Sequence, residues 1–205
     1  MTDPLAILAQ AISDVGYWRW WAAELPHVFQ VEFGGVQLWC PPPAKGEPPC
    51  GIVALRFAEP ISVVFLALSD GLPDDWIQQL HDDELEPFDV SNDRFAFNND
   101  ELASGLLQGA IKVTQLHGAA ADTERFREAE LKLCFAAESA GLIVAGNTMD
   151  LCTSQGPVQI EQAEEMSAKW WAYWKEYWKL RRTDKPLPRD YACEVTIPIK
   201  GDIDV

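Results

Sequence analysis

The clearest hydrophobic pattern in the chain has helical spacing and lies in residues 158–182. On a helix of about 3.6 residues per turn, the large apolar and aromatic residues share one side, and most lysines and arginines share the other. The residues on the aromatic side are Met166, Trp170, Trp171, Tyr173, Trp174, Tyr177 and Trp178. Acidic residues come early in the segment and basic residues late, as the helix dipole favours. The pattern predicts a long, Trp-rich amphipathic helix over 158–182.

Two other segments have a helical pattern. Residues 5–25 follow a capping Asp3 and are apolar on most sides, so the predicted helix needs cover from the fold or from a second subunit. Residues 123–140 end before Gly141, a residue type that commonly follows a helix C-terminus. Shorter helical segments are predicted to begin near residues 72–76 and to cover 102–111.

Alternation of apolar and polar residues predicts strands elsewhere. Residues 29–33 and 36–38 flank Gly34-Gly35, which predicts a hairpin because tight hairpin turns need positive φ angles. A second hairpin is predicted around Gly146-Asn147, between 142–145 and 148–152. Further strands are predicted at residues 52–57, 61–68, 112–116 and 191–199.

Together these elements predict a single α+β domain over residues 1–205. We expect an antiparallel sheet, made of the N-terminal hairpins and the C-terminal strand, to pack against three longer helices that include the Trp-rich helix 158–182. The chain is 48% hydrophobic and 23% charged, which is enough apolar material for a sizeable core. No linker-like segment divides it.

Composition narrows the classes of partner and site. The formal net charge of −16 opposes binding to duplex nucleic acid or to anionic lipid. No uncharged apolar run is long enough for a membrane span, and the first residues lack the features of a signal peptide, so we expect a cytoplasmic protein. The five cysteines form no CxxC pair, and we expect no structural metal and no cofactor.

An acidic segment at residues 70–101 holds eleven acidic residues against Arg94 alone. A calcium loop near Asp89–Asp100 is excluded, because Arg94 stands where the loop needs glycine. A solvated surface is the usual explanation of such a charge run. The alternative is that Asp82, Asp83 and Glu84 attract a basic protein partner by their electrostatic field.

Catalytic motifs are missing from the sequence. It has no GxSxG, no P-loop, no GxGxxG and no HExxH. The histidines His27, His81 and His117 lie far apart in the chain, and Cys134 and Cys193 fall on predicted core elements. Cys40 and Cys50 flank a proline-rich loop and are close enough in sequence to approach each other.

The Trp-rich helix carries the candidate binding residues, which are Trp170, Trp171, Trp174 and Trp178. Aromatic rings among cations are typical of single-strand nucleic-acid grooves or of membrane interfaces. Here rings and cations fall on opposite sides, which favours a core or subunit-interface face backed by solvated cations. The basic residues 169–189 are also opposite in charge to residues 70–101, so the two regions are expected to attract each other within a chain or between chains.

Three functions remain open on this sequence. The first is a non-enzymatic protein–protein interaction, of the inhibitor or immunity-protein kind, through acidic and aromatic surfaces. The second is a small-molecule binder or enzyme with a Trp-lined pocket that uses scattered polar residues such as His27, His117 and Asn147. The third is a structural homo-oligomer, most simply a dimer. We favour the first because every familiar catalytic spacing is missing.

Overall fold

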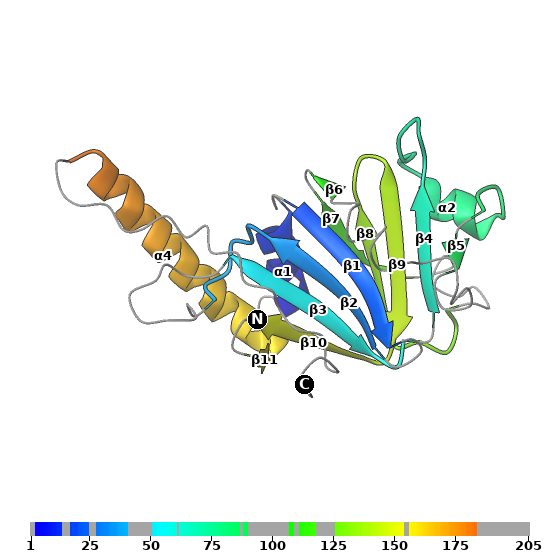
Figure 1. Ribbon diagram of the computed structural model, residues 1–205, viewed down its shortest axis with the longest axis horizontal. Coiled ribbons are helices and arrows are strands. Elements are labelled where there is room, and N and C mark those ends of the chain that lie inside the picture. The colour runs from blue at the N-terminus through cyan, green and yellow to red at the C-terminus, as the bar shows by residue number, and fades with distance from the viewer. Residues whose placement is uncertain are drawn as a thin grey trace.

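The computed structural model describes residues 3–13, 17–24, 28–40, 51–60, 62–86, 88–89, 107–108, 111–117, 126–153 and 156–183. These residues form an α+β fold with two antiparallel sheets (Figure 1). Several predicted features lie outside the described residues. They are the loop 41–50, the strand 191–199, His27, Cys50, Cys193 and, in the acidic segment, Asp93, Asp100 and Glu101. The prediction of one domain over 1–205 stays a prediction.

The two sheets each have four strands of four or more residues, with shorter strands at their edges. In spatial order, the first sheet contains β11 (Gly156–Val158), β10 (Thr148–Thr153), β3 (Ile52–Ala58), β2 (Val28–Gly34), β1 (Tyr17–Glu24) and β6 (Leu107–Gln108). The second contains β5 (Phe88–Asp89), β4 (Ser62–Ala67), β9 (Ala140–Gly146), β8 (Leu131–Ala136) and β7 (Lys112–Gln115). The described helices are α1 (Pro4–Ile12), α2 (Trp76–His81), the short 3-10 helix η2 (Ile160–Gln162) and α4 (Ala163–Arg181).

Two of the connections that carry the chain from one sheet to the other run next to each other. Strand β3 leads into β4, and β9 leads into β10. On the first sheet Ala58 pairs with Thr148, and on the second Ser62 pairs with Ala145. The sheets are therefore joined where the ends of β3, β4, β9 and β10 meet, and the strands spread from this place in Figure 1.

The main core lies between the sheets. Phe29, Val31 and Phe33 of β2 alternate with polar residues and are fully buried. The ring of Phe33 packs against Phe135 of β8, with centroids 5.8 Å apart. Helix α1 begins at the Asp3 cap, whose carboxylate accepts a hydrogen bond from the Leu5 amide at 3.0 Å. The helix adds Leu8, Ala11 and Ile12 to this core.

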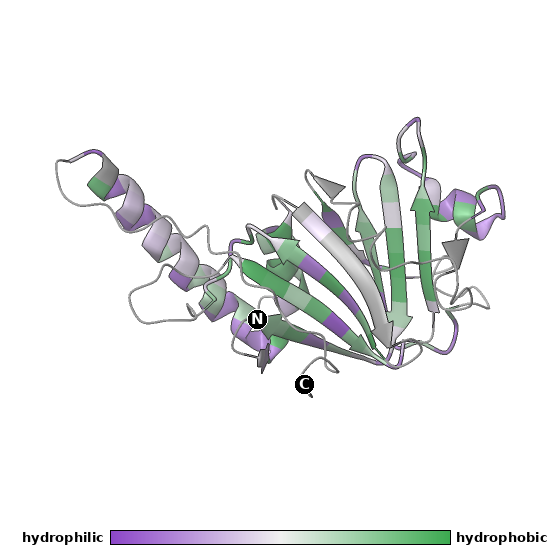
Figure 2. Cartoon of the chain, viewed as in Figure 1, coloured by the Kyte–Doolittle hydropathy of each residue, from purple (hydrophilic) through white to green (hydrophobic). Residues whose placement is uncertain are grey.

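A second apolar cluster covers the other face of the second sheet. Trp76 of α2 is buried there with Val64, Leu66 and Ile143. All seven residues of β9 are consequently buried, which explains why this strand is apolar or glycine at every position. Figure 2 shows mostly apolar colours on these strands, whereas α2 and α4 are largely polar or pale.

Two predicted helices are wrong over most of their length. The N-terminal helix ends at Ile12, and the aromatic residues after it form β1, in keeping with the preference of aromatic residues for strands. The predicted helix 123–140 is replaced by a turn at 126–128 and by β8. Only two described helices have seven or more residues, not the three long ones expected.

The predicted hairpins are also wrong, although their strands are largely correct. Gly35 has a φ of +85° as a turn requires, but residues 36–38 form no strand. Instead β2 pairs with β1 and β3. The strands around Gly146-Asn147 belong to different sheets, and so do β3 and β4. Of the predicted helix 102–111, the described residues Leu107–Gln108 form strand β6.

Gly141 gives a test of the packing of α2 on β9. A Cβ atom at this position would lie 2.6 Å from the buried Trp76 ring, whereas one at Gly146 would lie 3.6 Å from its nearest neighbour, the Cα of Pro60. We expect Gly141→Ala to lower the free energy of unfolding by about 1–3 kcal/mol, because the ring has to shift in a packed site. Urea unfolding measures the change, and Gly146→Ala is the matched control. Equal stabilities of the two variants would contradict this packing.

Candidate functional site

The Trp-rich helix is present, with α4 at Ala163–Arg181 after η2. A reciprocal cap starts η2: the side chain of Gln159 accepts a hydrogen bond from the Gln162 backbone, and the Gln159 amide donates to the Gln162 side chain at 3.0 Å. Glu164 and Glu165 follow in the first turn, where the helix dipole favours acids. At the other end, the amide and hydroxyl of Thr183 both donate to the Leu180 carbonyl at 2.9 Å.

One side of α4 is held against the body of the fold. Ala163, Met166, Trp170 and Tyr177 are buried at helical spacing, with Trp170 only 4% exposed. The Trp39 amide donates to the Met166 carbonyl at 2.9 Å, and the Trp39 ring meets Tyr173 edge-on at 5.6 Å. Beyond these contacts the helix extends away from both sheets (Figure 1).

The four tryptophans predicted as binding residues are brought together on α4. Trp174 stacks on Trp170 with centroids 5.4 Å apart and on Tyr177 at 5.0 Å. Trp171 packs edge-on against Trp170 at 4.9 Å, and Trp178 packs edge-on against Trp174 at 5.9 Å. Each ring is thus braced by another ring, which fixes the shape of the cluster.

The expectation that this aromatic side is shielded from water holds for only part of it. Trp170 and Tyr177 are buried and Trp174 is half-buried, but Trp171 is 49% and Trp178 is 42% exposed. These two rings lie seven residues apart, close to two turns, and so point to the same side of the helix. Among the described residues, they are the exposed large apolar side chains.

The acidic candidates Asp82, Asp83 and Glu84 lie elsewhere, directly after α2, and all three are exposed. Asp82 accepts a hydrogen bond from the Gln78 side chain at 2.8 Å and lies 3.6 Å from His81. Figure 1 places α2 and α4 at opposite ends of the molecule. The described acidic residues therefore do not meet the basic residues of α4 within one chain, which corrects that part of the prediction.

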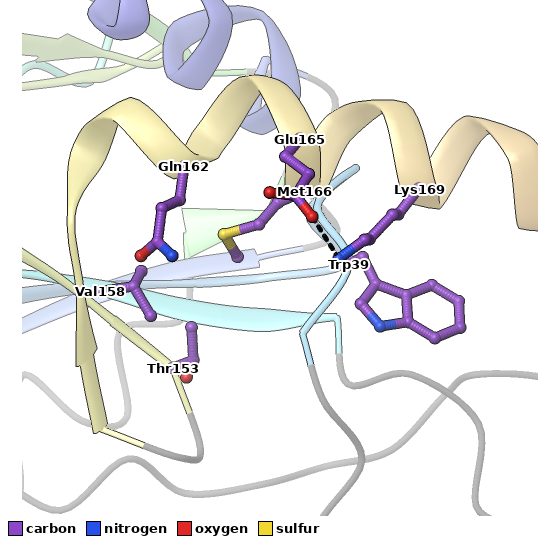
Figure 3. Close-up of a pocket in the computed structure, with 7 residues that line it drawn as sticks. All are labelled: Trp39, Thr153, Val158, Gln162, Glu165, Met166 and Lys169. Carbon is purple, nitrogen blue, oxygen red and sulfur yellow. Dashed lines mark ion pairs between the residues drawn. The ribbon is translucent and has the colours of Figure 1, made fainter.

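Sequence reasoning missed a small cavity beside the start of α4. It has a volume of about 210 Å³ and is lined by Trp39, Thr153, Val158, Gln162, Glu165, Met166 and Lys169. Figure 3 shows these side chains between α4 and the strands β10 and β11. Five of the seven lining residues fall within 158–182, but no local signal indicated that Trp39 would lie beside them.

The two charged residues at this cavity, Glu165 and Lys169, form an ion pair with each other. Lys169 Nζ lies 2.6 Å from Glu165 Oε1, and this hydrogen bond lowers the pKa of the fully exposed Glu165 carboxyl. The stability that the pair contributes is therefore present above the unfolded-state pKa and is lost as the pH falls through the folded-state pKa. His117 and Asn147, which we considered as pocket residues, are exposed and do not line the cavity.

Other chemistry is sparse in the part of the chain that the structure describes. Over those residues no three His, Cys, Asp or Glu side chains gather as metal ligands would. Nor does any described helix combine the length and apolar character needed to cross a bilayer. Protein-family models, curated proteins and solved structures yield no match to the chain.

The described cysteines Cys40, Cys134 and Cys152 are buried and form no disulfide. Burial raises the pKa of Cys134 to about 12, against the opposing hydrogen bond with Thr114. Burial also raises the pKa of Cys152, against the charge of Arg56. At neutral pH both are therefore thiols, which are poor nucleophiles.

Iodoacetamide labelling tests this assignment. At pH 8 we expect Cys134 and Cys152 to stay unlabelled in the folded chain and to be labelled in urea, with each site read by peptide mass spectrometry. Labelling of Cys134 in the folded chain as fast as in urea would contradict its burial.

Proposed function

We propose that this protein acts through protein–protein contacts rather than catalysis, and that the exposed side of α4 is its contact surface. The observation that supports this is the pair of exposed rings, Trp171 and Trp178, on a helix that extends from the body. Exposing two indoles opposes the hydrophobic effect, and a partner that covers them removes this cost. Tryptophan is also the residue type most enriched at interface hot spots.

The bracing of these rings supports the same proposal. Trp171 rests on Trp170, and Trp178 rests on Trp174, which is itself stacked on both sides. Rings that are already held lose little conformational freedom on binding, so more of the contact energy appears as affinity. The acidic residues Asp82, Asp83 and Glu84 lie at the far end of the molecule. Their attraction of a basic partner stays a prediction.

Site-specific crosslinking tests the proposed surface. We replace Trp171 or Trp178 by a photoreactive phenylalanine analogue and, as a control, place the analogue at the exposed Glu128. Irradiation in a lysate of the source cells is expected to give an adduct of one defined mass from 171 and 178 and none from 128. Excess unmodified protein should suppress an adduct with a different protein or increase one with a second copy of this chain, and Trp171→Ser/Trp178→Ser protein should do neither. Equal yields at all three positions would contradict the proposal.

A second candidate function is binding of a small molecule in the cavity beside Trp39. Its volume of about 210 Å³ is below the roughly 300–1,000 Å³ of typical ligand sites, so we place it second. Fragment screening by saturation-transfer NMR tests it. A fragment that binds the native chain but not a folded Trp39→Ala variant would support a ligand site there, and an absence of such fragments would contradict it.

A further inference from the structure

Resting on the proposed contact surface, we infer that the partner covering Trp171 and Trp178 is a second copy of this chain, with the two α4 helices antiparallel. The geometry of the exposed side carries the inference. Glu164, Trp171, Lys175, Trp178 and Arg182 follow one another at intervals of three, four or seven residues, so they form one stripe along the helix. All five are exposed.

The charges at the two ends of this stripe are complementary when the stripe is reversed. Glu164 stands at its beginning, Arg182 at its end and Lys175 near its middle. None of these three belongs to an ion pair with another residue of the described chain. The pairs that α4 does contain, Glu165 with Lys169 and Glu176 with Lys179, lie off the stripe.

Antiparallel pairing matches the rings and the charges at the two ends of the stripe, while Lys175, near its middle, lies beside Lys175 of the other copy in either arrangement. When Trp171 of one copy faces Trp178 of the other, Glu164 comes within one turn, or about 5 Å along the axis, of the opposing Arg182. Arg is long enough to close that gap. Parallel pairing would instead set Glu164 against Glu164 and Arg182 against Arg182, which is repulsive. The two helix dipoles also point in opposite directions, which is favourable for helices lying side by side, only in the antiparallel arrangement.

The interface is small, so the dimer is weak. Four half-exposed indoles and their neighbours bury an area in the class below about 1,200 Å² in total, which is typical of transient contacts. The net charge of −16 on each copy opposes association further. We therefore expect a dissociation constant in the micromolar range or weaker, so that protein concentration controls assembly.

A charge-swap series measured by sedimentation equilibrium tests the inference. Glu164→Lys places like charges together twice in the symmetric dimer and should raise the dissociation constant by about 3- to 30-fold. Adding Arg182→Glu restores opposite charges and should return it close to the native value. Residues 164 and 182 are about 27 Å apart along one helix, so this rescue requires contact between copies.

Glu165→Lys is the matched control. It makes the same charge change one residue away, near the same helix end, but on another side of α4. We expect it to leave the dissociation constant within about twofold, since exposed pairs contribute little. Trp171→Ser/Trp178→Ser should weaken the dimer at least about 100-fold, with far-UV circular dichroism showing that α4 stays folded.

Several outcomes overturn the inference. They are a native chain that stays monomeric up to about 1 mM, a double swap that restores nothing, and a Glu165→Lys variant as weak as Glu164→Lys. Association that Asp82→Lys/Asp83→Lys/Glu84→Lys abolishes and Glu164→Lys does not affect would indicate head-to-tail contact instead. A monomeric chain that still gives adducts of another mass at 171 and 178 refutes self-pairing alone, whereas loss of all adducts refutes the proposed function as well.

Discussion

The fold depends on the place where two strand connections cross together from one sheet to the other. Ala58 with Thr148 and Ser62 with Ala145 are paired on either side of this crossing. Because a shift of one residue would turn every side chain of a strand to the opposite face, these pairings set which residues of four strands enter the core. Phe33 and Phe135, on the strands that pair with β3 and β9, meet between the sheets.

The same crossing determines how α4 is attached. Strand β10 leaves the crossing, ends the first sheet with β11, and leads directly into η2 and α4. The helix is thus anchored at its beginning, through Met166 and Trp39, and the stacked rings of Trp174 and Tyr177 brace its second half. Because most of the stability of helices in proteins comes from packing of their apolar residues, the aromatic cluster helps to stabilise α4 itself.

The sequence predicted those elements whose pattern is local. Helix α4, β2, β3, β4 and β7 follow from periodicity, and the Asp3 cap correctly starts α1. Residues 131–136 were misassigned because Leu, Lys and Ala favour helices, although Leu133 and Phe135 also alternate as a strand requires. Pairing with β7 and β9 decides between the two patterns, and this pairing is not local.

The sequence predicted that the candidate binding tryptophans share one helix, but not how exposed each of them is. A helical wheel groups Trp170 with Trp171, yet the first is buried and the second is half exposed. Which flank of a helix meets the fold depends on segments distant in sequence, here α1 and Trp39. The cavity beside Trp39 escaped notice for the same reason, since residues from four separate segments line it.

The margins of the first sheet limit how the molecule can aggregate. Its outer strands, β11 and β6, have three and two residues, and β11 contains Pro157, which has no amide hydrogen to donate. A short edge that lacks a donor is a poor template for adding another strand, so cross-β growth from this side is disfavoured. Contacts between molecules along this sheet are then made by side chains. Substitutions can change the strength of such contacts without breaking the backbone hydrogen bonds between the strands.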